Sequence, residues 1–261
     1  LQISELDYEF SIIVLNDYSS LKHNIVLKNL KKIKNCKIIQ LNSNVGSQRA
    51  IAIGLRHISQ INMDEQNIII MDSDGQDDPE ILNKIIDMST KYPDDIITIN
   101  RTRRSEALWF KILYELHYYT LILLSGHKIR YGNYGLINTN KIEKLLLTGD
   151  LWSAYPAAIS KSFKKTNKIF HERKERYSGN TRMNLYKLFN HSVRVFSVFK
   201  YKIFIISLIY SAFFLFLGSS FYYFIFPLLL ANFLTFISSY KNKEKFDKCY
   251  ESIIDKVEMI K

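Results

Sequence analysis

Residues 67–79 read Asn-Ile-Ile-Ile-Met-Asp-Ser-Asp-Gly-Gln-Asp-Asp-Pro, a short apolar run followed at once by a turn rich in carboxylates. The run has the length and the β-branched character of a buried strand, and Pro79 suits the first turn of a following helix. Asp72 and Asp74 lie one residue apart at the end of this strand. Two carboxylates so close repel each other unless a cation lies between them, and oxygen ligands suit Mg²⁺ or Mn²⁺. The turn is therefore a candidate divalent-cation site.

Strand and helix signals alternate over residues 1–160. Strands are predicted at residues 10–15, 37–41, 67–71 and 96–99, and helices at residues 21–34, 48–58 and 79–90. This alternation predicts an α/β fold with a mostly parallel sheet that helices cover on both faces. Ligands bind at the carboxyl ends of the strands in such sheets. Because Asp17, Asp72 and Asp74 each follow a strand, we expect them to meet at one edge.

Several other kinds of site are excluded by motifs that the sequence lacks. No GxxxxGK[ST] or GxGxxG segment is present, and no histidines and cysteines have the spacing of a zinc site. The acidic turn does not fit an EF-hand, because Gly75 comes too early in the loop and Pro79 interrupts it. Cys36 and Cys249 lie far apart in a long chain, which excludes a small disulfide-bonded scaffold.

The positive charge of the chain is concentrated beside its apolar segment. The 261 residues carry a formal net charge of +11. Residues 161–202 hold twelve lysines and arginines against two acids, whereas residues 203–239 hold no charged side chain. We therefore expect no nucleic acid partner, because anionic membrane lipid is the nearer partner for these charges.

Two apolar runs, at residues 203–217 and 221–237, are separated by Gly218-Ser-Ser220. Together they predict a transmembrane helical hairpin that enters and leaves the membrane on one side. Five lysines flank the pair: Lys200, Lys202, Lys241, Lys243 and Lys245. By the positive-inside rule both flanks face the cytoplasm. The alternative is a buried core hairpin of a soluble protein.

Four segments follow from this pattern. They are an α/β domain at 1–160, a basic membrane-interface segment at 161–202, two transmembrane helices at 203–239, and a charged cytoplasmic tail at 240–261. Residues 184–200 predict a basic amphipathic helix, which lies either in the headgroup plane or against the α/β domain. Residues 109–124 predict another apolar-faced helix with the same two alternatives.

Six motifs in a fixed order, followed by the hairpin, make the chain resemble the family 2 glycosyltransferases. The motifs are Leu15-Asn-Asp-Tyr-Ser19, Asn44-Val-Gly-Ser-Gln-Arg-Ala50, Met71-Asp-Ser-Asp-Gly-Gln-Asp-Asp-Pro-Glu80, Asn100-Arg101, Gly132-Asn-Tyr-Gly-Leu136 and Glu175-Arg-Tyr-Ser-Gly-Asn180. More narrowly, the chain is similar to the polyprenyl-phosphate sugar transferases, relatives of dolichyl-phosphate mannose synthase. The resemblance implies a GT-A nucleotide-binding domain and an inverting transfer of a sugar from a nucleotide-diphosphate sugar to a polyprenyl phosphate.

The resemblance also implies roles for five residues on the donor side. Asp17 matches an acid that contacts the nucleoside. Asp72 and Asp74 match the family's DxD motif, in which the first acid contacts nucleotide and metal and the second binds the metal, Mg²⁺ or Mn²⁺. Gln76 and Asp77 match the pair that follows this motif near the donor. Asp72, Asp74 and Asp77 are thus the candidate catalytic residues.

On the acceptor side, Arg101 and Arg176 match family arginines that are placed to meet phosphates. With Lys111 they are the candidates to position the acceptor phosphate through charge-assisted hydrogen bonds. A lipid phosphate is already anionic at neutral pH, so it does not need a strong protein base. We expect an integral membrane protein with its catalytic domain on the cytoplasmic face of a bacterial inner membrane; its oligomeric state stays open.

The chain departs from the family pattern in three places. It begins at Leu1 without the family's first strand and its "PVYNE" turn, so we expect an N-terminally incomplete domain. Asn16 and Tyr18 replace the usual Asp and Gly of the first turn, and Asn133 replaces an Asp that many members carry. Two alternatives therefore stay open: an enzyme with a different lipid or glycan acceptor, and a truncated relative without catalysis.

Overall fold

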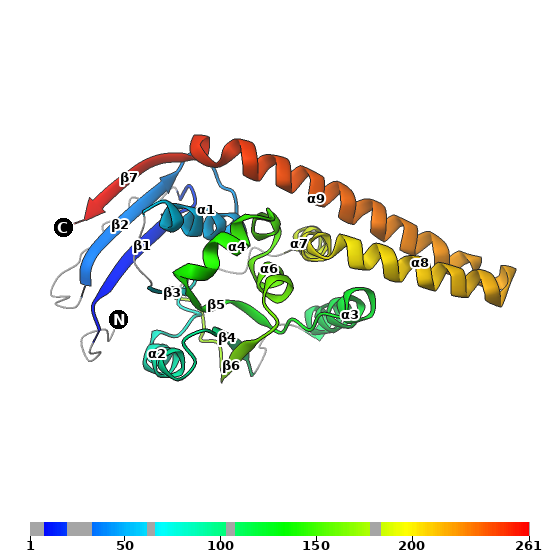
Figure 1. The fold of residues 1–261 in the computed structure, drawn as a ribbon, viewed down its shortest axis with the longest axis horizontal. Coiled ribbons are helices and arrows are strands. Elements are labelled where there is room, and N and C mark those ends of the chain that lie inside the picture. Colours follow the sequence, from blue (N-terminus) through cyan, green and yellow to red (C-terminus); the bar gives the residue numbers. More distant parts are fainter. Residues whose placement is uncertain (1–7, 20–32, 62–65, 103–107, 178–183, 261) are drawn as a thin grey trace.

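The computed structural model describes residues 8–19, 33–61, 66–102, 108–177 and 184–260. An α/β body carries a long helical hairpin that extends away from the sheets (Figure 1). Most of the helix predicted over residues 21–34 lies outside the described residues, and its last two residues begin a strand instead.

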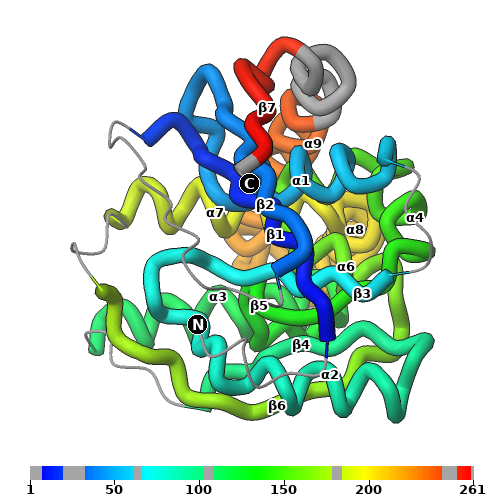
Figure 2. The backbone as a smooth tube through the Cα atoms, turned by 90° about the vertical axis from the view of Figure 1, so that its left-hand side faces the viewer, coloured from blue at the N-terminus to red at the C-terminus, as the bar shows by residue number. Residues whose placement is uncertain are grey.

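The first sheet has three strands, β1 (Phe10–Asn16), β2 (Ile33–Leu41) and β7 (Ile254–Ile260). β1 and β2 are parallel, as the sequence predicts, whereas β7 pairs antiparallel with β2. Figure 2 shows β7 beside β2, well away from β4 and β6. Of the segment expected as a charged tail, residues 240–253 continue the second hairpin helix and residues 254–260 complete this sheet.

The second sheet has the strand order β3-β5-β4-β6. Its strands are β3 (Asn67–Ile70), β4 (Ile96–Arg101), β5 (Tyr131–Asn138) and β6 (Thr166–His171). β5 lies between β3 and β4 and is antiparallel to both, and only β4 and β6 are parallel. The prediction of one mostly parallel sheet is therefore not confirmed: the described strands form two mixed sheets, because β5 and β7 enter them in the reverse direction.

Helices form where the sequence predicts them and in several further places. They are α1 (Ser47–Gln60), α2 (Leu82–Lys91), α3 (Leu108–Ser125), α4 (Ile142–Leu146), α5 (Asp150–Ser153), α6 (Tyr155–Ser162), α7 (Leu185–Val198), α8 (Lys200–Leu217) and α9 (Ile225–Ile253), with short 3-10 turns η2 (Pro79–Ile81), η3 (Thr139–Lys141) and η4 (Ser219–Phe224). Pro79 opens η2, where its missing N–H costs nothing, and η2 leads directly into α2.

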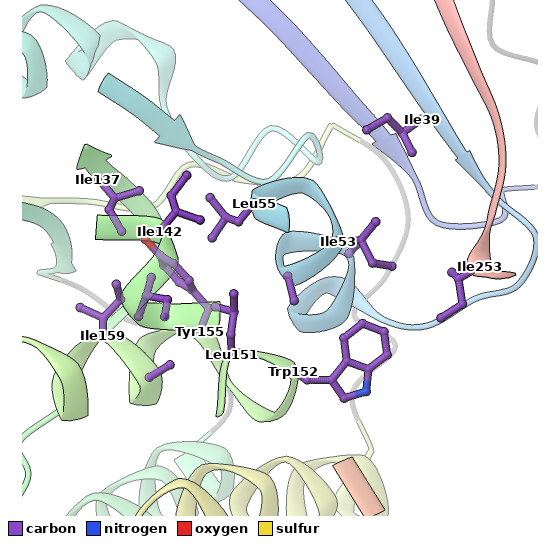
Figure 3. Close-up of a cluster of buried hydrophobic side chains, with 14 of the residues drawn as sticks. Ile39, Ile53, Leu55, Ile137, Ile142, Leu151, Trp152, Tyr155, Ile159 and Ile253 are labelled. Carbon is purple, nitrogen blue, oxygen red and sulfur yellow. The ribbon is translucent and has the colours of Figure 1, made fainter. Parts of the chain in front are cut away.

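The main core fills the space between the two sheets (Figure 3). Its side chains come from β2, α1, β5, the helices α4 to α6, and the end of α9: Ile39, Ile53, Leu55, Ile137, Ile142, Leu151, Trp152, Tyr155, Ile159 and Ile253. Because Ile253 at the end of α9 belongs to this core, the hairpin and the α/β body are one packed unit.

α8 and α9 are long and apolar enough to cross a membrane. The candidate spans Lys200–Leu217 and Ser219–Asn242 each have a mean hydropathy of 1.7, and 11% and 6% of their apolar windows are buried inside the protein. Helices of a soluble core are mostly buried, so this exposure opposes the core-hairpin alternative. Exposed apolar surface of this size marks a contact with membrane or protein.

Candidate functional site

The acidic turn, residues 71–78, follows β3 and is ordered by its own carboxylates. Asp77 accepts a hydrogen bond from the Asp72 N–H at 2.8 Å, and Asp74 accepts one from the Gln76 N–H at 3.0 Å. Gly75 has a φ of +86°, a conformation that favours glycine. These bonds fix the backbone of the turn and leave Oδ2 of Asp74 and the carboxylate of Asp72, both partly exposed, to meet other partners.

Asp77 differs from the other acids of the turn because it is buried, with 7% of its surface exposed. Burial raises the pKa of Asp77 to about 6, although the hydrogen bond from the Asp72 N–H and the charges of Arg173 and Arg101 oppose the rise. Asp77 thus holds the backbone of the turn while carrying a carboxyl group that titrates near neutral pH.

A short extended segment after β6 lies across the acidic turn; we call residues 172–177 the strap. Its two arginines pair with the carboxylates of Asp72 and Asp74. The Arg176 guanidinium lies 3.1 Å from Asp74 Oδ2, and the Arg173 guanidinium lies 3.7 Å from Asp72 Oδ2. Arg176 also donates from Nε to the Gln76 side chain at 3.1 Å.

Backbone contacts fix the strap along the turn. The Lys174 N–H donates to the Gln76 carbonyl at 3.1 Å, and the Tyr177 N–H donates to the Asp74 carbonyl at 3.0 Å. The Tyr177 ring lies directly over Gly75, where an added β-carbon would come within 2.6 Å of the ring. The strap therefore follows the turn residue by residue instead of touching it at one point.

Asp78 anchors the first part of the strap. It is 2% exposed and pairs with Lys174 at 2.9 Å and with His171 at 3.0 Å, while its carbonyl accepts from the Tyr134 hydroxyl at 2.7 Å. Burial alone would raise the pKa of Asp78, but hydrogen bonds from the Glu80 N–H, Lys174 and His171 outweigh it and lower this pKa. Asp78 is thus an ionised structural anchor.

Arg101, at the end of β4, lies over the neighbouring strand β5. A β-carbon added to Gly132 would come 3.1 Å from its guanidinium, so the glycine leaves room for this arginine. Arg101, Arg173 and Asp77 line a cleft with a volume of about 20 Å³. Such a volume holds about one water molecule, and the strap residues Glu172 and Arg173 form part of the wall of this narrow cleft.

Asp17 follows β1 and accepts two backbone hydrogen bonds just before the start of α1. Its Oδ1 accepts from the Val45 N–H at 2.7 Å and its Oδ2 accepts from the Gly46 N–H at 2.8 Å. Each of these oxygens retains a second lone pair that could accept a further hydrogen bond. A nucleoside contact by Asp17 stays a prediction. Tyr18 has a φ of +55°, which explains why a glycine suits this position in the family pattern.

The structure brings together five of the eight predicted site residues: Asp72, Asp74, Gln76, Asp77 and Arg176. Arg101 joins them across the cleft. Among the described interactions, none links Asp17 or Lys111 to the acidic turn, and Lys111 lies on α3, which packs against α7 and α8.

Sequence reasoning missed Arg173, Lys174, His171 and Tyr177, although the charged run His171-Glu-Arg-Lys-Glu-Arg176 directly after a strand is a signal for such contacts.

Asn133 has a structural partner in this chain. It accepts a hydrogen bond from the Gln48 side chain at 2.8 Å, and Gln48 in turn accepts from the Tyr155 N–H at 2.7 Å. Gln48 thus joins α1, β5 and α6. An amide at position 133 serves this bridge without taking up a proton.

The acidic turn fits a divalent cation that shares its coordination with a substrate. Within the described part of the chain, no group of three or more histidine, cysteine, aspartate or glutamate side chains is placed to hold a metal ion. Asp72 and Asp74 offer two carboxylates instead. Mg²⁺ commonly binds through one or two carboxylates, substrate phosphates and water, so this donor set suits a cation that arrives with a diphosphate.

An apolar groove of about 400 Å³ lies between α3, α7 and the two hairpin helices. Its lining includes Leu116, Phe189, Phe196, Ile203 and Leu234. His117 also lines it, and burial lowers the pKa of this imidazole to about 4, with a smaller effect from His191. The groove therefore presents a mostly apolar lining and keeps its histidine neutral.

Comparison with known proteins agrees with this architecture. The chain matches the model of Glycosyl transferase family 2 over residues 2–170 and belongs to this family. It is 28% identical over 194 residues to the uncharacterized glycosyltransferase YkoT of Bacillus subtilis, an alignment that covers 69% of this chain and 53% of that protein. It is 27% identical over 204 residues to the uncharacterized glycosyltransferase sll0501 of Synechocystis, with 73% of this chain and 59% of that protein covered. The chain thus spans little more than half the length of these relatives.

Proposed function

We propose that this chain is a membrane-anchored inverting glycosyltransferase, which moves a sugar from a nucleotide-diphosphate sugar to a polyprenyl phosphate. One observation carries the proposal. The same body holds an acidic turn that suits a cation–diphosphate pair and, beside an exposed apolar hairpin, a groove that suits a hydrocarbon tail. A donor with a diphosphate and an acceptor with a long tail need these two features together.

On the donor side, Asp72 and Asp74 are the residues that would hold Mg²⁺ or Mn²⁺. The cation would neutralise the diphosphate and stabilise it as a leaving group. Asp77 supports the role of Asp72 by fixing its backbone N–H at 2.8 Å. Arg101 and Arg176 stay assigned to the acceptor phosphate, as the resemblance implies. Because both lie beside this turn, their guanidinium groups, whose paired N–H donors match phosphate oxygens, can also meet the phosphates of the donor.

On the acceptor side, apolar side chains extend from the hairpin onto the neighbouring helices. α3 exposes Ile112, Leu116, Tyr119 and Leu123, which recur at helical spacing along one face. α7 exposes Leu185, Tyr186 and Phe189. An apolar face on helices beside candidate membrane spans suits the interface of a bilayer, and it supports membrane anchoring over a soluble location.

The proposed reaction requires little proton transfer by the protein. A phosphate oxygen of the acceptor attacks the anomeric carbon of the sugar, and the bond from that carbon to the nucleoside diphosphate breaks. The electron pair leaves with the diphosphate. Because the acceptor phosphate is already anionic, Asn133 is compatible with this chemistry although it cannot act as a base.

A transfer assay tests the proposal. Membranes that contain the full chain would receive Mn²⁺ or Mg²⁺, polyprenyl phosphate and a panel of radiolabelled nucleotide sugars. Asp74→Asn removes one proposed cation ligand, and Asp94→Asn is the matched control because Asp94 is exposed elsewhere. We expect an acid-labile, organic-soluble product with the unmutated chain and with Asp94→Asn, and a loss of roughly two orders of magnitude with Asp74→Asn.

Other outcomes would contradict specific parts of the proposal. Label that enters a water-soluble glycan or an acid-stable lipid would exclude the polyprenyl phosphate acceptor. Equal transfer by Asp74→Asn would exclude the cation role of that carboxylate. A complete absence of transfer with every donor would favour the alternative of a non-catalytic relative.

A further inference from the structure

We propose that the strap is a resident counterion of the acidic turn that exchanges partners when the donor binds. Arg173 and Arg176 would leave Asp72 and Asp74 to the divalent cation and turn to the diphosphate that the cation brings. This inference rests on the proposed donor site but not on the acceptor or on sugar transfer. The strap lies beyond the residues that match the family model, so the match does not carry it.

The exchange follows from competition for the same oxygen atoms. Asp74 Oδ2 lies 3.1 Å from the Arg176 guanidinium, while Asp74 Oδ1 already accepts the Gln76 N–H at 3.0 Å. Asp72 Oδ2 faces the Arg173 guanidinium. A divalent cation bound to these carboxylates would lie close to the guanidinium groups, and the positive charges would repel each other. Binding of the cation to both carboxylates must therefore weaken both ion pairs.

The size of the cleft gives a second and independent reason for movement. Its volume is about 20 Å³, and strap residues Glu172 and Arg173 line it together with Arg101. Pockets for ligands as large as a nucleotide sugar measure roughly 300–1,000 Å³. A nucleotide sugar therefore does not fit into this cleft as it stands, and movement of the strap, which forms part of its wall, would enlarge it.

The two ends of the strap are held differently. Lys174 pairs with Asp78 and with Glu80, and His171 supports Asp78, so this end is anchored by residues outside the proposed cation site. At the other end, Arg176 and Tyr177 contact Asp74, a proposed ligand of the cation, and its neighbour Gly75. Loss of those contacts would free the second end while the first end keeps the arginines close to the diphosphate.

The consequence is an opposite effect of these arginines on two ligands. Each arginine competes with a cation that binds alone, and each assists a diphosphate that binds together with the cation. Removal of an arginine should therefore tighten the binding of Mn²⁺ alone and weaken the binding of a nucleoside diphosphate in the presence of Mn²⁺. A strap with a purely structural role would change both affinities in the same direction.

The experiment measures both affinities on the purified full chain in detergent, without acceptor or sugar. Mn²⁺ binding is followed by electron paramagnetic resonance, and the diphosphates of uridine, guanosine, cytidine and thymidine are then titrated at saturating Mn²⁺. With Arg176→Gln we expect Mn²⁺ alone to bind about two- to fivefold more tightly, the factor that a partly exposed ion pair represents. We expect the preferred diphosphate to bind roughly tenfold more weakly.

Lys168→Gln is the matched control, because it removes the same charge from an exposed position on β6, just before the strap. It should change neither affinity by as much as Arg176→Gln does. If Arg176→Gln weakens or does not change the binding of Mn²⁺, or if no diphosphate binds to the unmutated chain, the exchange is wrong.

Trypsin cleavage of the unmutated chain provides a test that no folding defect can obscure. The strap contains three cleavage sites, after Arg173, Lys174 and Arg176. We expect cleavage there to accelerate with Mn²⁺ alone and to slow again when a diphosphate is added. Equal cleavage in all three states would overturn the inference. If the arginines exchange partners but no sugar is transferred, only the proposed acceptor chemistry is excluded. If sugar is transferred but the arginines do not exchange partners, only the proposed role of the strap is excluded.

Discussion

The aromatic ring of Tyr177 covers the α-carbon of Gly75 so closely that no β-carbon fits between them. The two residues are about a hundred positions apart in the sequence, and the contact places the end of the strap on the centre of the acidic turn. Gly75 is therefore required twice, once for its backbone conformation and once for the space above it.

A pair of glycine substitutions separates these two requirements. Gly75 and Gly46 share a φ of +86°, but a β-carbon on Gly46 would meet nothing within 4 Å. We expect Gly46→Ala to lower the free energy of unfolding by about 1–3 kcal/mol, the cost of a positive-φ, extended backbone conformation that is almost restricted to glycine. Gly75→Ala should cost about 1–3 kcal/mol more, because the ring must also move. Chemical denaturation in detergent measures the free energy of unfolding of both variants. Equal losses would show that the Tyr177 ring moves aside without an energetic cost.

Asp77 makes the stability of the protein depend on pH. The pKa of Asp77 is raised from 3.8 to about 6, so the folded chain holds this proton over a range where the unfolded chain has released it. The free energy of unfolding therefore falls as the pH rises from about 4 through about 6. Asp77→Asn cannot titrate and can still accept the Asp72 N–H. We expect the variant to lose less stability over this range, with a difference on the order of 2–3 kcal/mol at most. Parallel stability curves for the two proteins would contradict the assigned burial.

Asn242 connects the second hairpin helix to the α/β body. It is 5% exposed, accepts from Arg49 at 3.2 Å and donates to Ser153 at 3.1 Å. Asn242→Ala should lower the free energy of unfolding by about 1–3 kcal/mol, because buried polar groups lose their partner. Asn140→Ala, at an exposed site, should have almost no effect. A normal melting temperature for Asn242→Ala would mean that α9 does not depend on this connection.

The apolar groove can be tested by filling it. Ser192 on α7 lines the groove, and Ser192→Trp would place an indole where a hydrocarbon tail is proposed to lie. We expect the KM for a long-chain polyprenyl phosphate to rise roughly tenfold, which corresponds to the lost burial of about two methylene groups. The KM for a short-chain acceptor and the affinity for the donor should not change. Thr90→Trp, on the exposed end of α2, is the control. Equal loss with both acceptors would place the tail elsewhere.

The local parts of the fold were predictable because local patterns encode them. The predicted strands at residues 10–15, 67–71 and 96–99 and the helix at residues 48–58 are confirmed as β1, β3, β4 and α1 within a few residues. The reversed directions of β5 and β7 were not predictable. β5 contains Gly132 and Gly135, which lower its strand signal. Gly135 is nevertheless required there, because a β-carbon would come 2.3 Å from the Ile97 carbonyl. Such a requirement arises from a neighbouring strand far away in the sequence.

The residues of the candidate site also fall into two groups, those that a local pattern reveals and those that only the tertiary structure reveals. Asp72 and Asp74 were identifiable because their spacing at a strand end carries the chemistry within a few residues. Arg173 was not, since its importance depends on a pairing with Asp72 across 101 positions of sequence. A charged residue in a run of charged residues gives no sign of which partner it meets. The tertiary structure supplies that information.

The hairpin is attached to the body at both of its ends. α8 begins directly where α7 ends, and α9 runs through Ile253 into β7, which pairs with β2 (Figure 1). With two attachments the hairpin cannot swivel relative to the sheets, so on the proposed anchoring the acidic turn would stay at a constant height above the bilayer. An acceptor dissolved in that bilayer would then be found by lateral diffusion in two dimensions, and only phosphates carried at that height would be reached.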